Sequence, residues 1–539
     1  MRKKKKRRKN MYNLRLVCGM LLAAGALLAE ARADVRLPKF FTDNMMLQRD
    51  KPIRVWGWAA PGEEVQAALA GKDVAAKKAT KADDKGRWSV ELPALKEGEK
   101  LVLTVTGKNT ITLKNVILGD IWLCSGQSNM SMPLMACPWD TPEHINFGAP
   151  EDSKKADFPK IRHLSINGRL SSDPLEDSPT LPNISNWQVC SPQLTGSHVF
   201  TAAGFYFARE VFGKTGVPIG IIDDAWSSSA IEPWIPQEGV EAVPELKEAW
   251  DKRQKAIADY RLAKGRPPTI PPTIIPDLEG IAKENWCSIY NAMINPLIRI
   301  PIKGVLWYQG ESNFQDPGDL YYHKMRALVN GWRKKWGQGD FPFYYVQLAS
   351  MYGVNDNPEV DWGYGLIRPV QLKTMAIPNT GMAVAIDIGE AENIHPRDKL
   401  DVGLRLARWA LARDYGQKDL VPSGPLFKEM KIEGDKARIS FDYVGSGLMV
   451  GFKDGSTLQG ALAPTVEDKQ SKLKRFAIAG ADKKWHWADA AIDGKTVVVS
   501  SPAVKKPVAV RYAMSSNPKG ANLYNREGLP ASPFRTNNW

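Results

Sequence analysis

The chain has 539 residues, of which 43% are hydrophobic and 24% are charged, so it is globular rather than disordered and too long for a single hydrophobic core. Its formal net charge of +14 is concentrated in residues 1–33, which hold ten of the 73 basic and one of the 59 acidic residues. The remaining 63 basic and 58 acidic residues leave a net charge of about +5, which argues against nucleic acid as a partner.

Residues 1–33 are typical of a secretory signal peptide. A basic stretch, MRKKKKRRKN, precedes the apolar run LVCGMLLAAGALLA, and Ala31-Arg32-Ala33 forms a small-residue cleavage site. The alternative is a membrane anchor, but the apolar run is shorter than the roughly 20 residues of a spanning helix. We therefore expect cleavage before Asp34, a periplasmic or secreted protein, and no stable membrane insertion after cleavage.

Four cysteines remain after the signal peptide: Cys124, Cys137, Cys190 and Cys287. An exported protein can form disulfides, but four cysteines allow three full pairings and the sequence selects none. No CxxC pair is present, so we expect no zinc site, and no ligand cluster supports another metal or a redox cofactor. We interpret Cys124 as a small buried hydrophobic residue.

Short strand-like runs separated by turns fill residues 34–115. The runs are IRVWGWA, EVQAALA, GRWSVELP and LVLTVTG, and the turn sequences include APGE, DDKG and KEGE. This pattern predicts a small antiparallel N-terminal β domain.

Apolar strands alternate with helical segments over residues 116–415. The strand-like runs are VILGDIWLCSG, VPIGIIDDAW, IKGVLWYQG, FPFYYVQLA and MAVAIDIG, and the helical segments include AAGFYFAREVFGK, YYHKMRALVNGWRKKW and KLDVGLRLARWALARDY. Such alternation predicts a parallel sheet covered by helices on both faces. A charged helical stretch followed by the proline-rich GRPPTIPPTIIP predicts an insertion at about residues 236–280.

A strand-like pattern returns in residues 416–539. Its runs are KARISFDYV, LQGALA, KTVVVSS and VAVRYAM. They predict a β-rich C-terminal region.

Three polar segments follow buried strands, where ligands bind in open α/β sheets. Ser128 follows the first strand, QGESN (residues 309–313) follows GVLWY, and His395 lies just beyond VAIDIG. A serine, a histidine and polar donors are the parts of a serine hydrolase. Ser128 alone is also compatible with a simple turn, and the G-x-S-x-G elbow is absent because residue 130 is Met.

His395 is the strongest candidate for a base among the six histidines. It follows a buried strand and precedes a proline and a predicted helix. The others are interpreted as packing or surface residues (His323, His486) or lie in loop-like stretches (His144, His163, His198). Glu392 can fix the imidazole tautomer and stabilise the imidazolium, with Glu390 and Asp387 as competitors for this role.

Taken together, these segments resemble the SGNH hydrolases and, within them, the sialate O-acetylesterase family of carbohydrate esterases. The similar blocks, in the expected order, are LGDIWLCSGQSNMSMP, VPIGIIDDAW, YNAMINPLIRIPIKGVLWYQGESN, NTGMAVAIDIGEAENIHPRDKLDVGLRLA and the C-terminal NLYNREGLPASPFRTNNW. The resemblance covers roughly residues 36–539. It implies a flavodoxin-like three-layer α/β/α catalytic domain. It also implies removal of O-acetyl groups from a glycan, such as sialic acid or a plant polysaccharide, through an acetyl-Ser intermediate.

The resemblance also assigns roles by position. Ser128 would be the nucleophile and His395 the general base, and the Ser128 N–H would bind the oxyanion together with a side-chain amide of Gln309 or Asn313. Glu311 would orient the site or act as the acid, in competition with Glu392. The last two family positions, which would contact the substrate or simply start a structural helix, are Arg368 and Gln371.

One segment departs from the family pattern. Relatives usually carry a Gly-Gly pair after the tryptophan of the second block, where this chain has Ser227, Ser228 and Ser229. The Ser228 N–H can still bind an oxyanion, but serine avoids positive φ. The alternative function is therefore a non-catalytic glycan-binding protein on an esterase scaffold, and a serine peptidase has no motif support. The sequence leaves the oligomeric state open.

Overall fold

The computed structural model describes residues 34–135, 145–166, 170–171, 173–177, 186–197, 199–263, 286–360 and 362–539. The predicted signal peptide, the proline-rich part of the predicted insertion, Cys137, His144 and His198 lie outside these ranges. Within them, no helix combines the length and the apolar character needed to cross a membrane. The described chain forms two compact units, residues 34–43 with 49–117 and residues 44–48 with 118–539.

The first unit is built from antiparallel strands. They are β2 (Ile53–Trp58), β3 (Glu64–Ala70), β4 (Ala75–Lys81), β5 (Arg87–Leu92), β6 (Leu101–Thr106) and the first part of β7 (Thr110–Gly126). Strand β2 pairs with β5, and the order β4-β3-β6-β7 forms the other ladder. Every second residue of β3 and β5 is buried, as in a strand with one face on a core. The sequence did not indicate β4, because AAKKATK is charged and mostly exposed.

The second unit contains the sheet that positions the site, in the order β13-β12-β11-β7-β10-β8-β9. Its further strands are β8 (Phe158–Ser165), β9 (Gln188–Cys190), β10 (Ile219–Ala225), β11 (Gly304–Tyr308), β12 (Phe343–Gln347) and β13 (Thr380–Val384), and the short β1 (Met46–Gln48) also pairs with β7. All neighbours are parallel except β8 and β9. The order β10-β7-β11-β12-β13 is the flavodoxin-like 2-1-3-4-5, with β8 and β9 added at one edge.

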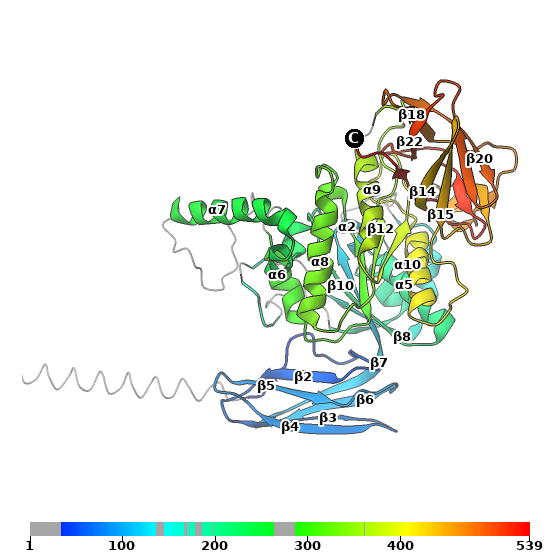
Figure 1. Cartoon of the computed structure of the whole chain (residues 1–539). Coiled ribbons are helices and arrows are strands. Elements are labelled where there is room, and N and C mark those ends of the chain that lie inside the picture. The colour runs from blue at the N-terminus through cyan, green and yellow to red at the C-terminus, as the bar shows by residue number, and fades with distance from the viewer. Residues whose placement is uncertain are drawn as a thin grey trace, which may run out of the picture. The chain divides into compact units, whose positions relative to one another are not determined.

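Helices cover both faces of this sheet (Figure 1). They are α5 (Ala202–Thr215) and α10 (Lys399–Arg413), which pack together, and α8 (Leu320–Trp336), which packs against α6 (Gln237–Glu241) and α9 (Tyr364–Lys373). Successive residues of β12 point to opposite faces. Tyr344 stacks on Trp409 of α10, whereas Phe343 contacts Trp332 of α8. The predicted flavodoxin-like three-layer α/β/α architecture is therefore confirmed.

Short elements and the predicted insertion complete this part of the chain. They are α2 (Ser128–Ser131), α3 (Ala149–Lys154), α4 (Pro192–Gly196), η2 (Glu232–Trp234), η3 (Pro244–Leu246), α7 (Lys247–Ala263), η6 (Tyr290–Ile294), η7 (Asn295–Leu297), η8 (Glu311–Asn313) and η9 (Thr374–Ala376). The three described cysteines, Cys124, Cys190 and Cys287, are buried free thiols. Cys124 is fully buried, as expected for a small hydrophobic residue.

The C-terminal part of the second unit is β-rich, as predicted. Its strands pair in the orders β14-β15-β21-β20, β19-β18-β22-β24 and β17-β16-β23. Their bounds are β14 (Leu426–Glu433), β15 (Lys436–Asp442), β16 (Leu448–Phe452), β17 (Val466–Glu467), β18 (Phe476–Gly480), β19 (Trp485–Trp487), β20 (Asp489–Asp493), β21 (Thr496–Ser500), β22 (Pro507–Tyr512), β23 (Leu523–Asn525) and β24 (Phe534–Arg535). Residues such as Ile439, Ile478 and Val510 join these strands in one apolar core.

Two sequence interpretations are wrong. The run LQGALA is not a strand but the helix α11 (Leu458–Leu462), whose first turn is capped where Thr457 Oγ1 accepts a hydrogen bond from Gly460 N at 3.2 Å. His163 is not in a loop but buried in β8. The sequence FPKIRHLS hides this strand because charged residues interrupt its apolar positions.

Candidate active site

The nucleophile candidate lies where β7 ends, at the switch point between β7 and β11. Gly126 has φ +130°, and a Cβ atom there would lie 2.2 Å from the carbonyl oxygen of Tyr308, so only glycine fits. Gln127 N donates to the same carbonyl at 3.0 Å. The chain then turns into α2, whose first residue is the half-buried Ser128. The Ser128 N–H occupies a helix position that has no acceptor within the helix.

Ser128 and His395 meet at this edge of the sheet, although 267 positions separate them in the chain. Ser128 Oγ lies 2.8 Å from His395 Nε2, and both side chains are half-buried. The His395 main-chain N–H donates to Asn393 Oδ1 at 2.9 Å, which shapes the turn that presents the ring. A hydroxyl within hydrogen-bond reach of an imidazole is the arrangement of an activated serine.

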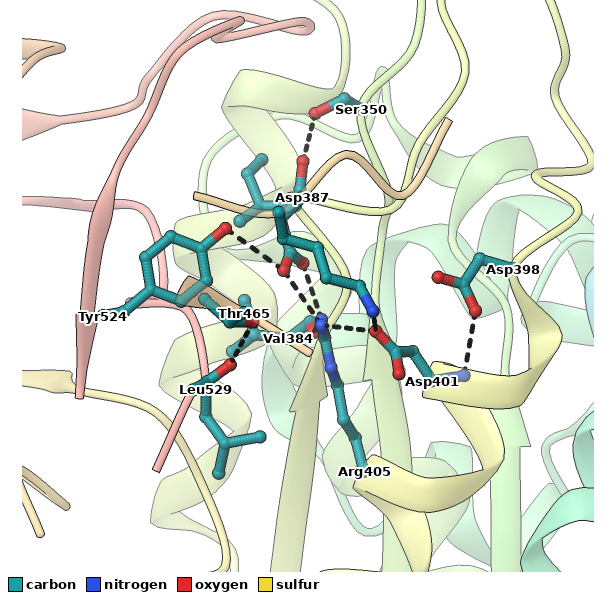
Figure 2. Close-up of polar contacts among 12 residues, drawn as sticks. Ser350, Val384, Asp387, Asp398, Asp401, Arg405, Thr465, Tyr524 and Leu529 are labelled. Carbon is teal, nitrogen blue, oxygen red and sulfur yellow. Dashed lines mark hydrogen bonds and ion pairs between the residues drawn. The ribbon is translucent and has the colours of Figure 1, made fainter. Parts of the chain in front are cut away.

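Buried ion pairs anchor the loop that carries His395 (Figure 2). At the start of the loop, the Asp387 carboxylate binds Arg405 at 2.6 and 2.9 Å and accepts a hydrogen bond from Tyr524 Oη at 3.2 Å. Arg405 also reaches Asp401 at 3.1 Å, and Lys453 binds the same carboxylate at 2.9 Å. The C-terminal β-rich part of the chain thus helps to fix this loop, because it supplies both Lys453 and Tyr524.

The three carboxylates considered as partners of His395 differ in their surroundings. The Asp387 side chain is only 3% exposed and is bound to Arg405, and Glu390 binds Arg397 through contacts of 2.7 to 3.2 Å. Glu392 lies on the surface of the same loop. Asp387 and Glu390 therefore serve as structural anchors, and Glu392 is the candidate of this loop that no arginine engages.

The side chain of Asn129, next to Ser128, joins three segments of the site. Asn129 Nδ2 donates to Glu311 Oε1 at 2.5 Å and to the Ile394 carbonyl at 2.9 Å, and Asn129 Oδ1 accepts from Lys399 Nζ at 2.6 Å. Burial raises the pKa of Glu311, against the opposing effects of the Asn129 hydrogen bond and the Lys399 charge. Glu311 therefore contacts the residue that follows Ser128.

Lys399 is the buried cation of this network. Its Nζ also donates to the Pro396 carbonyl at 2.8 Å, and burial lowers its pKa to about 7. Ile394 and Pro396 flank His395, so Asn129 and Lys399 together hold the main chain on both sides of the imidazole. Neither residue was predicted from the sequence, although Asn129 lies next to Ser128 and Lys399 lies four residues after His395.

The amide side chains of the QGESN segment, one of which the resemblance assigns to the oxyanion, have polar partners within the protein. Gln309 is fully buried, and its Nε2 donates to Asn313 Oδ1 at 2.8 Å and to the Ser229 carbonyl at 3.3 Å. Asn313 Nδ2 donates to Glu232 at 3.1 Å and Asp316 at 3.2 Å. All four amide hydrogens are thus used within the scaffold, where they brace the loop after β11.

Arg368 and Gln371 lie beneath the surface, so they are not placed to contact a substrate. Arg368 is fully buried and donates to the carbonyls of residues 348, 349, 515 and 516 at 2.6 to 3.0 Å. Gln371 Oε1 accepts from Leu348 N at 3.0 Å. Both side chains fix the loop after β12, which is the structural role given above as the alternative to substrate contact.

The serine-rich turn after β10 borders the nucleophile. Trp226 N donates to the Gly126 carbonyl at 3.0 Å, two residues before Ser128. Ser228 is exposed and has φ +59°, so the turn keeps the left-handed conformation that glycine would adopt more easily. Ser229 is buried, and its Oγ accepts from Trp234 Nε1 at 2.9 Å.

We expect Ser228→Gly to raise the free energy of unfolding by about 1 kcal/mol, because glycine removes the cost of positive φ at this position. Ser227→Gly is the matched control, since Ser227 is exposed in the same turn without positive φ, and glycine there adds only unfolded-state entropy. Denaturant unfolding measures both variants. Equal destabilisation by the two glycines would contradict this account of the turn.

We expect the stability of the wild-type protein relative to Asp398→Asn to fall as the pH rises from about 5 to about 8. Asp398 is fully buried at the start of α10, where Oδ1 accepts from Asp401 N at 3.0 Å (Figure 2). Burial, followed by repulsion from the Asp401 carboxylate, raises the pKa of Asp398 to about 7.

Proton binding explains why the relative stability of the wild type falls as the pH rises. Because the pKa of the folded state exceeds the ordinary value of about 4, the folded state binds more protons than the unfolded state. The stabilisation is fully present below about pH 4 and is lost as the pH rises through 7, with a slope approaching ~1.4 kcal/mol per pH unit. Asparagine keeps the helix cap but does not titrate. Thermal unfolding of the wild type and of Asp398→Asn at about pH 5 and about pH 8 measures the effect. A difference in stability between the two proteins that does not change with pH would contradict it.

Comparisons with known proteins show similarity to carbohydrate esterases. The family described as carbohydrate esterase, sialic acid-specific acetylesterase matches residues 279–412, which include Glu311 and His395. The sialate O-acetylesterase of Mus musculus is 29% identical over 553 residues and that of Homo sapiens 28% over 559 residues, and each alignment covers 96% of both chains. The crystal structure of a carbohydrate acetylesterase from Xanthomonas citri is 36% identical, with a TM-score of 0.76 and coverage of 94% of this chain and 100% of that chain.

Proposed function

We propose that this chain, which belongs to the sialate O-acetylesterase family of SGNH carbohydrate esterases, is an exported serine esterase that deacetylates a glycan through an acetyl-Ser128 intermediate. Its general activity, carbohydrate O-acetylester hydrolysis, follows from the family. The observation that carries the mechanism is the 2.8 Å contact between Ser128 Oγ and His395 Nε2 at the carboxyl edge of the sheet. The basic and apolar segments within residues 1–33 support export.

In the first half-reaction, His395 Nε2 removes the Ser128 proton while Ser128 Oγ attacks the acetyl carbonyl carbon. The main-chain N–H groups of Ser128 and Ser228 are the proposed donors to the resulting oxyanion, and each such donor is typically worth about 10²–10³-fold in rate. When the tetrahedral intermediate collapses, His395 returns the proton to the sugar oxygen, and the sugar alcohol leaves. Proton transfer of this kind contributes about 10²–10⁴-fold.

In the second half-reaction, water attacks the acetyl carbonyl of acetyl-Ser128. His395 removes a proton from the water and then gives it to Ser128 Oγ as the acyl bond breaks. Acetic acid leaves and ionises to acetate and a proton, and the serine hydroxyl and neutral imidazole are restored, so the cycle consumes one water for each acetyl group.

Two carboxylates have supporting roles in this proposal. Glu392, in the same loop as His395, is the candidate that favours the imidazolium electrostatically, because the neighbouring Glu390 is bound to Arg397. Glu311 holds Asn129 rather than acting as a proton donor to the leaving group, which is supported by their 2.5 Å contact.

Acetate release from a panel of acetylated glycans tests the proposed function. The panel includes 9-O-acetylsialic acid, acetylated xylo-oligosaccharides and an aryl acetate, and free acetate is measured with a coupled assay. We expect release from at least one glycan and from the aryl acetate. Binding of glycans without any release of acetate would instead support the glycan-binding alternative.

A further inference from the structure

A row of four aromatic side chains extends from the catalytic edge of the sheet to the surface: Phe314, Tyr364, Tyr352 and Trp362. The ring centroids of consecutive members lie 5.6, 5.7 and 5.0 Å apart. Tyr364 is buried, Phe314 and Tyr352 are half-buried, and the last ring, Trp362, is 52% exposed. An exposed tryptophan supported by a second ring is a preformed, largely apolar surface.

This aromatic row is attached to both loops that carry the reacting side chains. Phe314 follows η8, where Ser312 N donates to Oε1 of Gln127, the residue before Ser128, at 3.4 Å. On the other side, Tyr352 N donates to the Ala391 carbonyl at 2.8 Å, four residues before His395. The segments that carry Phe314 and Tyr352 are therefore hydrogen-bonded to the segments that precede Ser128 and His395.

The loop that presents Trp362 is held in place. Tyr352 has φ +69°, an uncommon conformation for a bulky residue that surrounding contacts must impose. Its carbonyl accepts from Asn517 Nδ2 at 2.8 Å. Further along the loop, the Asp356 carbonyl accepts from Trp487 Nε1 at 2.8 Å, and its carboxylate binds Arg475 at 2.7 Å. The platform is thus fixed from both sides, as a preorganised binding surface requires.

The charges of the two bordering loops favour an uncharged ligand. Residues 348–363 and 385–396 contain no Lys or Arg, and Glu359 and Glu392 are exposed. Two guanidinium groups that reach these loops, Arg475 and Arg397, are paired with carboxylates of the loops themselves. A carboxylate on the ligand would meet like charge there. The hydroxyl-poor face of a neutral pyranose, in contrast, packs on an aromatic ring and buries apolar area.

We propose that Trp362, supported by Tyr352, is a stacking platform for a neutral sugar ring that neighbours the acetylated one. The substrate class is then an acetylated neutral oligosaccharide or polysaccharide rather than an acetylated monosaccharide. This inference rests on the proposed esterase function of Ser128 and His395 and concerns only what that site selects.

The test compares wild-type protein with Trp362→Ala on acetylated xylo-oligosaccharides of increasing length, 9-O-acetylsialic acid and an aryl acetate. For the wild type, kcat/KM should increase with chain length. Trp362→Ala should lower kcat/KM for the longer oligosaccharides about tenfold, mainly through KM. Trp362→Phe should keep most of the wild-type increase of kcat/KM with chain length. Trp539→Ala, which removes a ring that is 43% exposed at the C-terminus, should change nothing.

The outcomes separate this inference from the function on which it rests. If the wild type hydrolyses the aryl acetate but its kcat/KM for the glycans does not depend on chain length, the stacking platform is overturned and the esterase function is retained. The same conclusion follows if Trp362→Ala changes kcat/KM for no glycan. A higher kcat/KM for 9-O-acetylsialic acid than for every oligosaccharide would also overturn it. Hydrolysis of neither glycan nor aryl acetate would remove the proposed function, and the inference with it.

Discussion

Ser128→Ala is expected to lower kcat for acetate release by about 10⁴-fold or more, because it removes the atom that forms the acyl bond. The effect on the fold should be small. Ser128 is half-buried, and its main-chain N–H, which we propose as an oxyanion donor, is unchanged by the substitution. The measurement is kcat on an aryl acetate and on the best glycan substrate, with circular dichroism and thermal unfolding as controls for the fold.

A double variant makes this prediction sharper. Because Ser128 and His395 act as one unit, Ser128→Ala combined with His395→Ala should lose no more activity than the worse single variant. Independent, multiplicative losses would show that the two side chains act in separate ways. A folded Ser128→Ala protein that keeps full activity would remove Ser128 from the mechanism.

Lys399→Met is expected to lower kcat by about 10²-fold with little change in KM, since displacement of a catalytic group by about 1 Å can cost that much. Lys399 touches no reacting atom. It holds the Pro396 carbonyl and Asn129 Oδ1, and Asn129 in turn holds the Ile394 carbonyl. Loss of the ammonium should therefore displace His395 relative to Ser128, whereas binding of the distant parts of the sugar should persist.

The matched control for Lys399→Met is Arg333→Met. Arg333 is a buried cation that donates to the carbonyls of Phe341 and Asn379, which precede β12 and β13 at the opposite edge of the sheet. The Arg333→Met variant should have a lower melting temperature than the wild type but the same kcat. If both variants lose stability and kcat in parallel, Lys399 has only a structural role. If kcat falls only in Lys399→Met, it is a positioning residue.

The sequence was informative where function follows from chain order. Apolar runs predicted the strands β7, β10, β11, β12 and β13, and parallel strands bring their carboxyl ends to one edge. Ser128 and His395 could be found because each follows such a strand. This topology alone was enough to predict that Ser128 and His395 lie at the same edge of the sheet.

The sequence was uninformative where a polar side chain has remote partners. Gln309 and Arg368 have the residue types expected of substrate contacts, yet buried carbonyls and amides from elsewhere occupy their donors. Lys399 was missed for the converse reason, because a lysine near a helix start ordinarily lies in solvent. Only the packed structure shows that this lysine is fully buried.

The most direct test of the central claim is to identify the acetylated residue during turnover. Protein mixed with an excess of aryl acetate is quenched in acid on the millisecond scale, digested and examined by peptide mass spectrometry. Our account predicts one acetyl group on the peptide that contains Ser128, formed rapidly in the wild type and absent in Ser128→Ala. Acetate release without any acetyl group on Ser128, or with the acetyl group on another residue, would contradict the mechanism.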